Sequence, residues 1–176
     1  NNTINEFPKN YLSIWDGIVM GGGAGISIYG NNRLVSEKGK FAMPETAIGF
    51  FPDVGGSYFL SRLPNGIGLY LGLTGRVCNA RDMMDLGLAT HYLPSNCLPK
   101  AIELYIKNGN IDTSDYYPET SSEIIENKNF IEDIFQGNIV EIIYKLEKSK
   151  SEYGKKLYSH LLTRCPMSLA VTTKLI

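Results

Sequence analysis

The chain has 176 residues, of which 43% are hydrophobic and 20% charged, so it can bury a core and is not a disordered sequence. Its 17 basic and 18 acidic side chains give a formal charge of -1, which argues against nucleic acid or an anionic membrane as a partner. No apolar run reaches the length of a membrane span. Three cysteines and two histidines lie far apart in the sequence, so neither a disulfide framework nor a metal site is expected.

The N-terminal part of the chain predicts short strands. Residues 11–16 alternate and contain β-forming side chains, and residues 18–20 continue extended into three glycines. Residues 24–29 are small and apolar, which predicts a short buried helix. Residues 33–37 and 40–43 indicate two more strands around a Lys-Gly turn.

The rest of the chain is mainly helical, with one short strand expected at residues 89–93. Helices are expected at residues 54–63, 67–73, 79–86, 100–107, 123–130, 140–146, 153–162 and 168–176. Asn79 is a good N-cap for its helix. An apolar stripe at helical spacing predicts a core face formed by Ile139, Ile142, Ile143 and Leu146. Residues 111–122 are rich in turn formers, so two domains are expected, 1–109 and 110–176.

Two acids, Glu45 and Asp53, stand in the otherwise apolar stretch 43–56, and each directly follows a proline. Apolar neighbours such as Ile48, Phe50 and Phe51 predict that the site is partly buried. Burial disfavours the charged form of a carboxylate and therefore raises its pKa. A raised pKa suits proton transfer near neutral pH, so both acids are candidates for catalysis.

Both acids also have a purely local interpretation, which the pattern by itself leaves open. Pro44 can occupy the first position of a short helix, where the helix dipole favours a neighbouring Glu45. Asp53 can N-cap a helix that starts at Val54. Acids are common at helix starts, so their local pattern does not assign chemistry.

Three consecutive glycines, Gly21, Gly22 and Gly23, precede the small apolar segment. They predict either a turn or a helix N-terminus whose bare backbone N–H groups could stabilise an oxyanion. The dinucleotide-binding fingerprint fits poorly because its third glycine is missing. The Walker type of phosphate-binding loop is excluded because no Lys-Ser/Thr pair follows.

A set of motifs in fixed order carries a family resemblance. They are DGIVMGGGAGIS (16–27), FAMPETAIGFFPDVGG (41–56), LSRLP (60–64), LTG (73–75) and GLATH (87–91). Together they closely resemble the crotonase (enoyl-CoA hydratase/isomerase) superfamily, and within it the branch that hydrolyses 3-hydroxyisobutyryl-CoA. The resemblance is strong over residues 11–93, about half the chain, and weaker in the helical tail. It implies an α/β fold, a spiral of β-β-α units with a C-terminal helical region, of which this chain would be a fragment lacking the N-terminal part.

The resemblance also implies roles for three residues that would contact an acyl-CoA substrate. Gly22 matches the family's oxyanion-hole donor. Glu45 matches the glutamate of the Pro-Glu motif, which acts as an acid/base or as a nucleophile. Asp53 matches an acidic position that the hydrolase branch retains. The family's second oxyanion donor is expected upstream of Asn1.

One departure from the family pattern separates its branches. Hydratases have a second glutamate just after the triple glycine, where this chain has Gly25, and they usually have glycine at the position of Asp53. The resemblance therefore implies thioester hydrolysis of 3-hydroxyisobutyryl-CoA, as in valine catabolism. The alternatives are an enoyl-CoA hydratase or isomerase, and a non-catalytic crotonase-like subunit of a mitochondrial ribosome. Glu45 and Asp53 are both present, which argues against the ribosomal alternative.

The remaining expectations concern partners, cofactors and location. Coenzyme A would be part of the substrate, so no separate cofactor or metal is expected. Lys38, Lys40 and Arg62 are available for its phosphates, and the sequence does not choose among them. No nucleic acid or membrane partner is expected, and a homo-oligomer is compatible with the family. The location would be mitochondrial or cytoplasmic, with no targeting segment visible in this chain.

Overall fold

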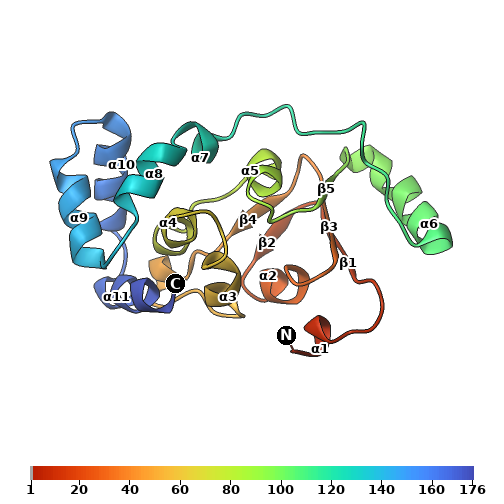
Figure 1. Ribbon diagram of the computed structural model, residues 1–176, viewed down its shortest axis with the longest axis horizontal. Helices are drawn as coiled ribbons and strands as arrows, with labels where there is room; N and C mark the ends of the chain where they lie inside the picture. Colours follow the sequence, from red (N-terminus) through yellow and green to blue (C-terminus); the bar gives the residue numbers. More distant parts are fainter. Residues whose placement is uncertain (1) are drawn as a thin grey trace. The chain divides into compact units, whose positions relative to one another are not determined.

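The computed structural model describes residues 2–176, apart from the side chain of Asn5 (Figure 1). It contains two compact units. Unit 1 comprises the chain up to Phe41 together with Cys78–Ile125, and unit 2 comprises Ala42–Val77 together with Glu126–Ile176. Each unit is therefore built from two stretches that are far apart in the sequence.

Unit 1 contains a parallel three-stranded sheet with the order β1-β3-β5. Its strands are β1 (Leu12–Trp15), β3 (Asn32–Val35) and β5 (His91–Tyr92). A second, two-stranded sheet pairs β2 (Ile18–Met20) with β4 (Lys40–Ala42). All five strands lie within the predicted segments or overlap them, so the strand positions predicted from the alternating pattern are confirmed.

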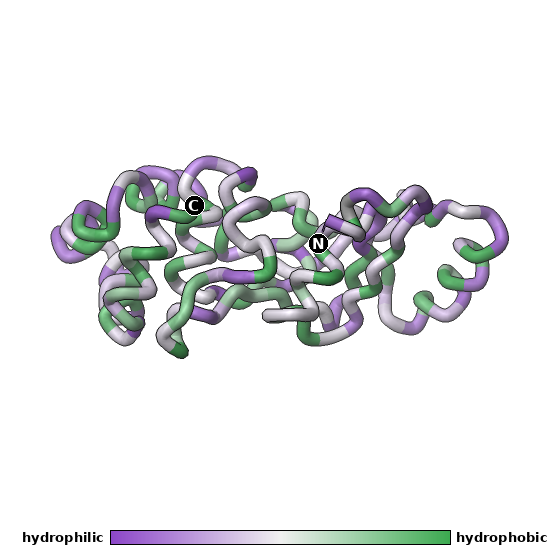
Figure 2. Tube along the Cα trace, turned by 90° about the horizontal axis from the view of Figure 1, so that it is seen from below, coloured by the Kyte–Doolittle hydropathy of each residue, from purple (hydrophilic) through white to green (hydrophobic). Residues whose placement is uncertain are grey.

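The helices of unit 1 are mostly short. They are α1 (Asn2–Asn5), α2 (Gly22–Ser27), α5 (Ala80–Asp85), the 3-10 helix η2 (Ser95–Cys97), α6 (Leu98–Asn108) and α7 (Glu123–Glu126), whose last residue belongs to unit 2. The predicted N-cap of α5 is confirmed, because the Asn79 side chain accepts the Asp82 N–H and the Asp82 carboxylate accepts the Asn79 N–H. Hydrophobic and hydrophilic residues are interspersed along α6 in the pattern of an amphipathic helix (Figure 2).

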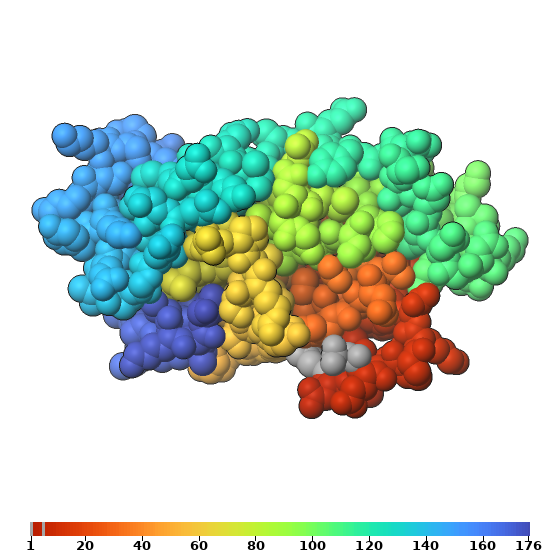
Figure 3. All heavy atoms as spheres, viewed as in Figure 1, coloured from red at the N-terminus to blue at the C-terminus, as the bar shows by residue number. Residues whose placement is uncertain are grey.

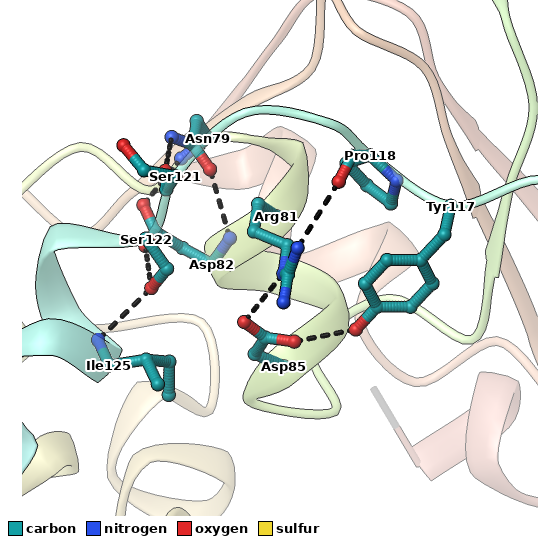
Figure 4. A network of polar contacts seen from close by, with 9 residues as sticks. All are labelled: Asn79, Arg81, Asp82, Asp85, Tyr117, Pro118, Ser121, Ser122 and Ile125. Carbon is teal, nitrogen blue, oxygen red and sulfur yellow. Dashed lines mark hydrogen bonds and ion pairs between the residues drawn. The ribbon is translucent and has the colours of Figure 1, made fainter.

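The turn-rich segment before α7 is held on α5 by side-chain hydrogen bonds (Figure 4). The Ser122 hydroxyl donates to the buried Asp82 carboxylate at 2.6 Å, and the Tyr117 hydroxyl donates to Asp85 at 2.5 Å. Arg81 donates to Asp85 at 2.8 Å and lies over the Tyr117 ring. Because a buried carboxylate must be hydrogen-bonded, Asp82 ties this otherwise irregular segment to the helix.

Unit 2 is helical. It comprises the 3-10 helix η1 (Glu45–Ile48) and the helices α3 (Gly56–Leu60), α4 (Ile67–Thr74), α8 (Lys128–Ile134), α9 (Ile139–Lys148), α10 (Glu152–Leu161) and α11 (Pro166–Leu175). Seven of the eight residues of α4 are buried, as expected for a helix that is apolar all round. It packs against η1, α3, α8, α10 and α11. The residues of α9, α10 and α11 lie against one another in Figure 3. None of the described helices is long and apolar enough to cross a membrane.

Several helix boundaries differ from their prediction by two residues or more. The helix predicted at 54–63 is shorter, because Val54 and Gly55 have positive φ and α3 starts only at Gly56. The helix predicted at 123–130 is two helices, α7 and α8, separated at Asn127. α11 starts at Pro166 rather than at 168, since proline is well placed in a first helical turn. Of the predicted apolar stripe, Ile142 and Leu146 are buried, and Ile139 and Ile143 line an apolar cavity on the surface of unit 2.

The close approach of α4 to α3 yields a test of the packing. A Cβ on Gly68 would overlap the carbonyl group of Leu60, whereas a Cβ on Gly23, also helical, would meet no atom within 4 Å. We expect Gly68→Ala to destabilise the protein by about 3 kcal/mol, because the obstacle is backbone and cannot rotate away. The matched variant Gly23→Ala should be neutral or slightly stabilising. Urea unfolding of both variants measures the difference, and equal midpoints would contradict this account of the α3–α4 contact.

Candidate active site

Glu45 is the first residue of η1, which directly follows β4 and Pro44. Its side chain is only 6% exposed. Two hydrogen bonds fix the short helix around it. The Thr46 hydroxyl donates to the Leu73 carbonyl of α4 at 3.0 Å, and the Cys165 N–H donates to the Thr46 carbonyl at 3.2 Å. Helices α4 and α11 thereby hold Glu45 against the core of unit 2.

The surroundings of Glu45 favour its protonated form. Burial is the main cause that raises its pKa, and the negative charge of Asp53 raises it further, while a hydrogen bond from its own backbone N–H acts in the opposite direction. Its Oε2 is buried and has no hydrogen-bond partner. A buried carboxylate with an unoccupied acceptor is unfavourable for stability and suited to taking up a proton.

The predicted burial of the site is confirmed at Glu45. Of the apolar neighbours that indicated it, Phe51 is half-buried, whereas Ile48 is 81% exposed and Phe50 is 44% exposed. Helices α4 and α11, which are distant in sequence, pack against η1. The local helix-start interpretation is right about the backbone, because Pro44 is the N-cap of η1 and Glu45 lies in its first turn. A helix of four residues has only a weak dipole, so it does not offset the effect of burial.

Asp53 is half-buried and does not cap a helix. The N-cap of α3 is Gly55, without a side-chain hydrogen bond, so the capping interpretation of Asp53 is wrong. Asp53 instead opens a tight turn in which its carbonyl accepts the Gly56 N–H at 2.6 Å. Its negative charge is the smallest of the causes that act on the pKa of Glu45, and it raises that pKa.

Gly22 is the first residue of α2, after Gly21 with its φ of +52°. An N–H at this position has no acceptor within the helix. Gly22 is exposed, and a Cβ on it would meet no atom within 4 Å, so its backbone is open to a ligand. Gly25, which replaces the second glutamate of hydratases, is buried inside the same helix. Gly22 belongs to unit 1, whereas Glu45 belongs to unit 2, so their action on one substrate stays a proposal.

Two of the basic residues considered for CoA phosphates already have protein partners. Lys38 donates to the Ser95 hydroxyl at 2.7 Å. Arg62 lies 3.4 Å over the centre of the Tyr58 ring. Neither contact uses all the N–H donors of its side chain, so both residues stay candidates for binding a phosphate. Among the described residues, no group of three or more His, Cys, Asp or Glu side chains could hold a metal ion.

Comparison with known proteins identifies the family. The family model described as enoyl-CoA hydratase/isomerase matches residues 1–176. The chain belongs to the enoyl-CoA hydratase/isomerase family. This agrees with the fold expected from the motifs and with the mixed strands and helices observed.

Named members of the enoyl-CoA hydratase/isomerase family share much of this sequence. The mitochondrial 3-hydroxyisobutyryl-CoA hydrolase of Xenopus laevis is 41% identical over 98% of this chain and 48% of its own length. A carnitinyl-CoA dehydratase structure from Mycobacterium thermoresistibile has a TM-score of 0.88 at 36% identity, covering 98% of this chain and 52% of that chain. An enoyl-CoA hydratase structure from Rhodobacter sphaeroides has a TM-score of 0.90 at 32% identity, covering 98% of this chain and 51% of that chain. The chain thus spans about half the length of the relatives it matches.

The raised pKa of Glu45 predicts how stability depends on pH. The folded state holds a proton on Glu45 at pH values where the unfolded state has released it. Stability is therefore lost as the pH rises from the ordinary glutamate pKa of 4.5 through the folded pKa. We expect Glu45→Gln to raise the Tm at pH 7 and to leave it unchanged below pH 4.5. The exposed Glu152→Gln is the control, and a lower Tm for Glu45→Gln at pH 7 would contradict the assignment.

Proposed function

We propose that the protein is an acyl-CoA thioester hydrolase that acts on 3-hydroxyisobutyryl-CoA. The observation that carries this proposal is the buried Glu45, whose pKa is raised by burial and whose Oε2 has no partner. The names of relatives about 40% identical supply the substrate. The pair Glu45 and Asp53, together with Gly25 in place of the hydratase glutamate, favours hydrolysis over hydration.

In one route Glu45 is a general base. It takes a proton from a water whose oxygen attacks the thioester carbon, and the carbonyl electrons move onto oxygen. When the carbonyl re-forms, the C–S bond breaks and the CoA thiolate takes the proton back from Glu45. In the other route the Glu45 carboxylate attacks the carbon itself and expels the thiolate. Water then hydrolyses the resulting anhydride and regenerates the carboxylate.

Both routes pass through a tetrahedral oxyanion that needs a donor. The N–H of Gly22 would donate to it, because this group has no acceptor inside α2 and belongs to an exposed residue without a side chain. Asp53 would hold the hydroxyl of the substrate or orient Glu45. Its charge also keeps the pKa of Glu45 raised.

The relatives' names also support a cellular location and a metabolic role for this protein as part of the proposal. The vertebrate and Dictyostelium hydrolases are named as mitochondrial, and we include a mitochondrial location in the proposal. The hydrolysis requires only water besides the acyl-CoA, so no separate cofactor is proposed. The reaction would release a 3-hydroxy acid from coenzyme A, as valine catabolism requires.

The proposed reaction is tested by measuring free CoA released from 3-hydroxyisobutyryl-CoA by the full-length protein. Glu45→Gln should lower kcat/KM by about 10²-fold or more, since it removes the base or nucleophile while keeping the shape. The exposed Glu152→Gln should match the wild type. The wild-type rate should rise with pH through a pKa above that of an ordinary glutamate. Hydration of crotonyl-CoA without CoA release would instead identify a hydratase.

The oxyanion role of Gly22 has a test that preserves the helix. Gly22→Pro removes the N–H at the first position of α2, where proline is well tolerated. We expect kcat to fall by about 10²–10³-fold, as when one oxyanion donor is removed, with little change in far-UV circular dichroism. Gly23→Ala, which keeps every N–H, is the control. An unchanged kcat in a folded Gly22→Pro protein would exclude Gly22 as the donor.

A further inference from the structure

Unit 2 has an apolar surface cavity that the proposed reaction does not use. The cavity lies among α9, α10 and α11, which are drawn in shades of blue in Figure 1, and has a volume of about 300 Å³. Of the described residues that line it, seven are Ile, Val, Leu or Pro, and the eighth is Arg164. Two of the apolar residues, Val140 and Leu162, are largely exposed, so the cavity can be reached from solvent. Apolar walls with one charged group are typical of a small-molecule site.

The guanidinium of Arg164 lacks a compensating anion. The side chain is half-buried, and none of the ion pairs found among the described residues includes it. Its Nε is buried without a hydrogen-bond partner. A guanidinium keeps its charge at physiological pH, and removing its N–H groups from water is unfavourable unless an acceptor replaces the water. The cavity therefore has a charged donor on its wall that is available to a ligand.

The contact between Arg164 and His160 does not supply the missing acceptor. Arg164 Nη2 and the Thr74 carbonyl oxygen each lie 2.7 Å from His160 Nε2. One nitrogen cannot donate to the carbonyl and accept from the guanidinium at the same time. Thr74 is buried at the end of α4, where its carbonyl has no partner inside the helix, so we assign the proton to His160 Nε2. Arg164 then faces another donor at this contact.

We propose that this cavity binds a free carboxylate with an apolar tail, such as a medium-chain fatty acid. The carboxylate would accept N–H groups of Arg164, because the planar fork of a guanidinium matches a carboxylate. The tail would lie against Ile139 and Ile143 of α9 and Leu169 of α11. The apolar walls offer no partner to a second polar group, so dicarboxylates and hydroxy acids fit poorly. The site lies within unit 2 and does not depend on the proposed hydrolysis.

The ligand class is tested by calorimetric titration of the full-length protein with sodium octanoate below its micelle concentration. Octan-1-ol and octylamine have the same tail and serve as control ligands. We expect both to bind at least tenfold more weakly than octanoate, because neither offers an anionic acceptor to the guanidinium. Octanoate should also raise the Tm, since a ligand that binds only the folded state stabilises it.

The deciding variant is Arg164→Met, which keeps an unbranched side chain and removes the charge. The affinity for octanoate should fall about 10–100-fold, and the affinity for octan-1-ol should not change. Without ligand the variant should be at least as stable as the wild type, because it removes a half-buried charge that has no anionic partner. Arg164→Lys, which keeps the charge but not the fork, should lose less affinity. Lys156→Met, which removes an exposed charge of α10 outside the cavity lining, is the matched control and should bind octanoate like the wild type.

Free coenzyme A distinguishes the cavity from the proposed active site, and it should leave the affinity for octanoate unchanged. Displacement of octanoate by coenzyme A would overturn the proposal, since the ligand would then occupy the active site. Full octanoate affinity in a folded Arg164→Met protein would overturn it as well. If that variant does not fold, the ligands decide, because equal affinities for octanoate and octan-1-ol, or no binding of octanoate, would show that the wild-type cavity does not recognise a carboxylate.

Discussion

The candidate site depends on the way η1 is held in the core. A four-residue 3-10 helix has too few hydrogen bonds to be stable by itself. It is kept in place by the Thr46 hydroxyl on the carbonyl of Leu73 and by the Cys165 N–H on the carbonyl of Thr46. These bonds join η1 to α4 and to the start of α11. They hold the Glu45 side chain where it is largely buried and its charge is poorly solvated, and this burial is the main cause of its raised pKa.

Two features of unit 2 are unfavourable for the stability of the folded state. Glu45 Oε2 is buried without a partner, and Val54 holds a backbone conformation that disfavours its side chain. Either feature alone would be an imperfection of packing. Asp53 lies between them in the sequence, and its charge adds to the burial that raises the pKa of Glu45. Rigid elements such as α4 compensate for this, because seven of its eight residues are buried.

Unit 1 contains a different kind of candidate group, the backbone N–H donors at the start of α2. Its α2 starts with exposed glycine backbone, and the glycine at the hydratase glutamate position is buried in the same helix. The helix can therefore offer backbone N–H groups but no carboxylate at that point. This difference in chemistry is one reason why we propose hydrolysis rather than hydration, although structures titled as a dehydratase and a hydratase share the fold.

The sequence by itself determined where most strands and helices form and which residues are candidates for the active site. Strand positions, the Asn79 cap and the apolar α4 followed from period, capping chemistry and hydrophobicity, all of which act over a few residues. The motifs identified the family and named Gly22, Glu45 and Asp53. Tertiary structure decided which elements pack against η1 and how deeply Glu45 is buried. The site is buried as predicted, but Ile48 and Phe50 are exposed, and η1 packs against α4 and against residues of α11 more than a hundred positions away. The left-handed Val54 was likewise beyond local prediction, since valine avoids that conformation unless packing at both ends of the turn imposes it.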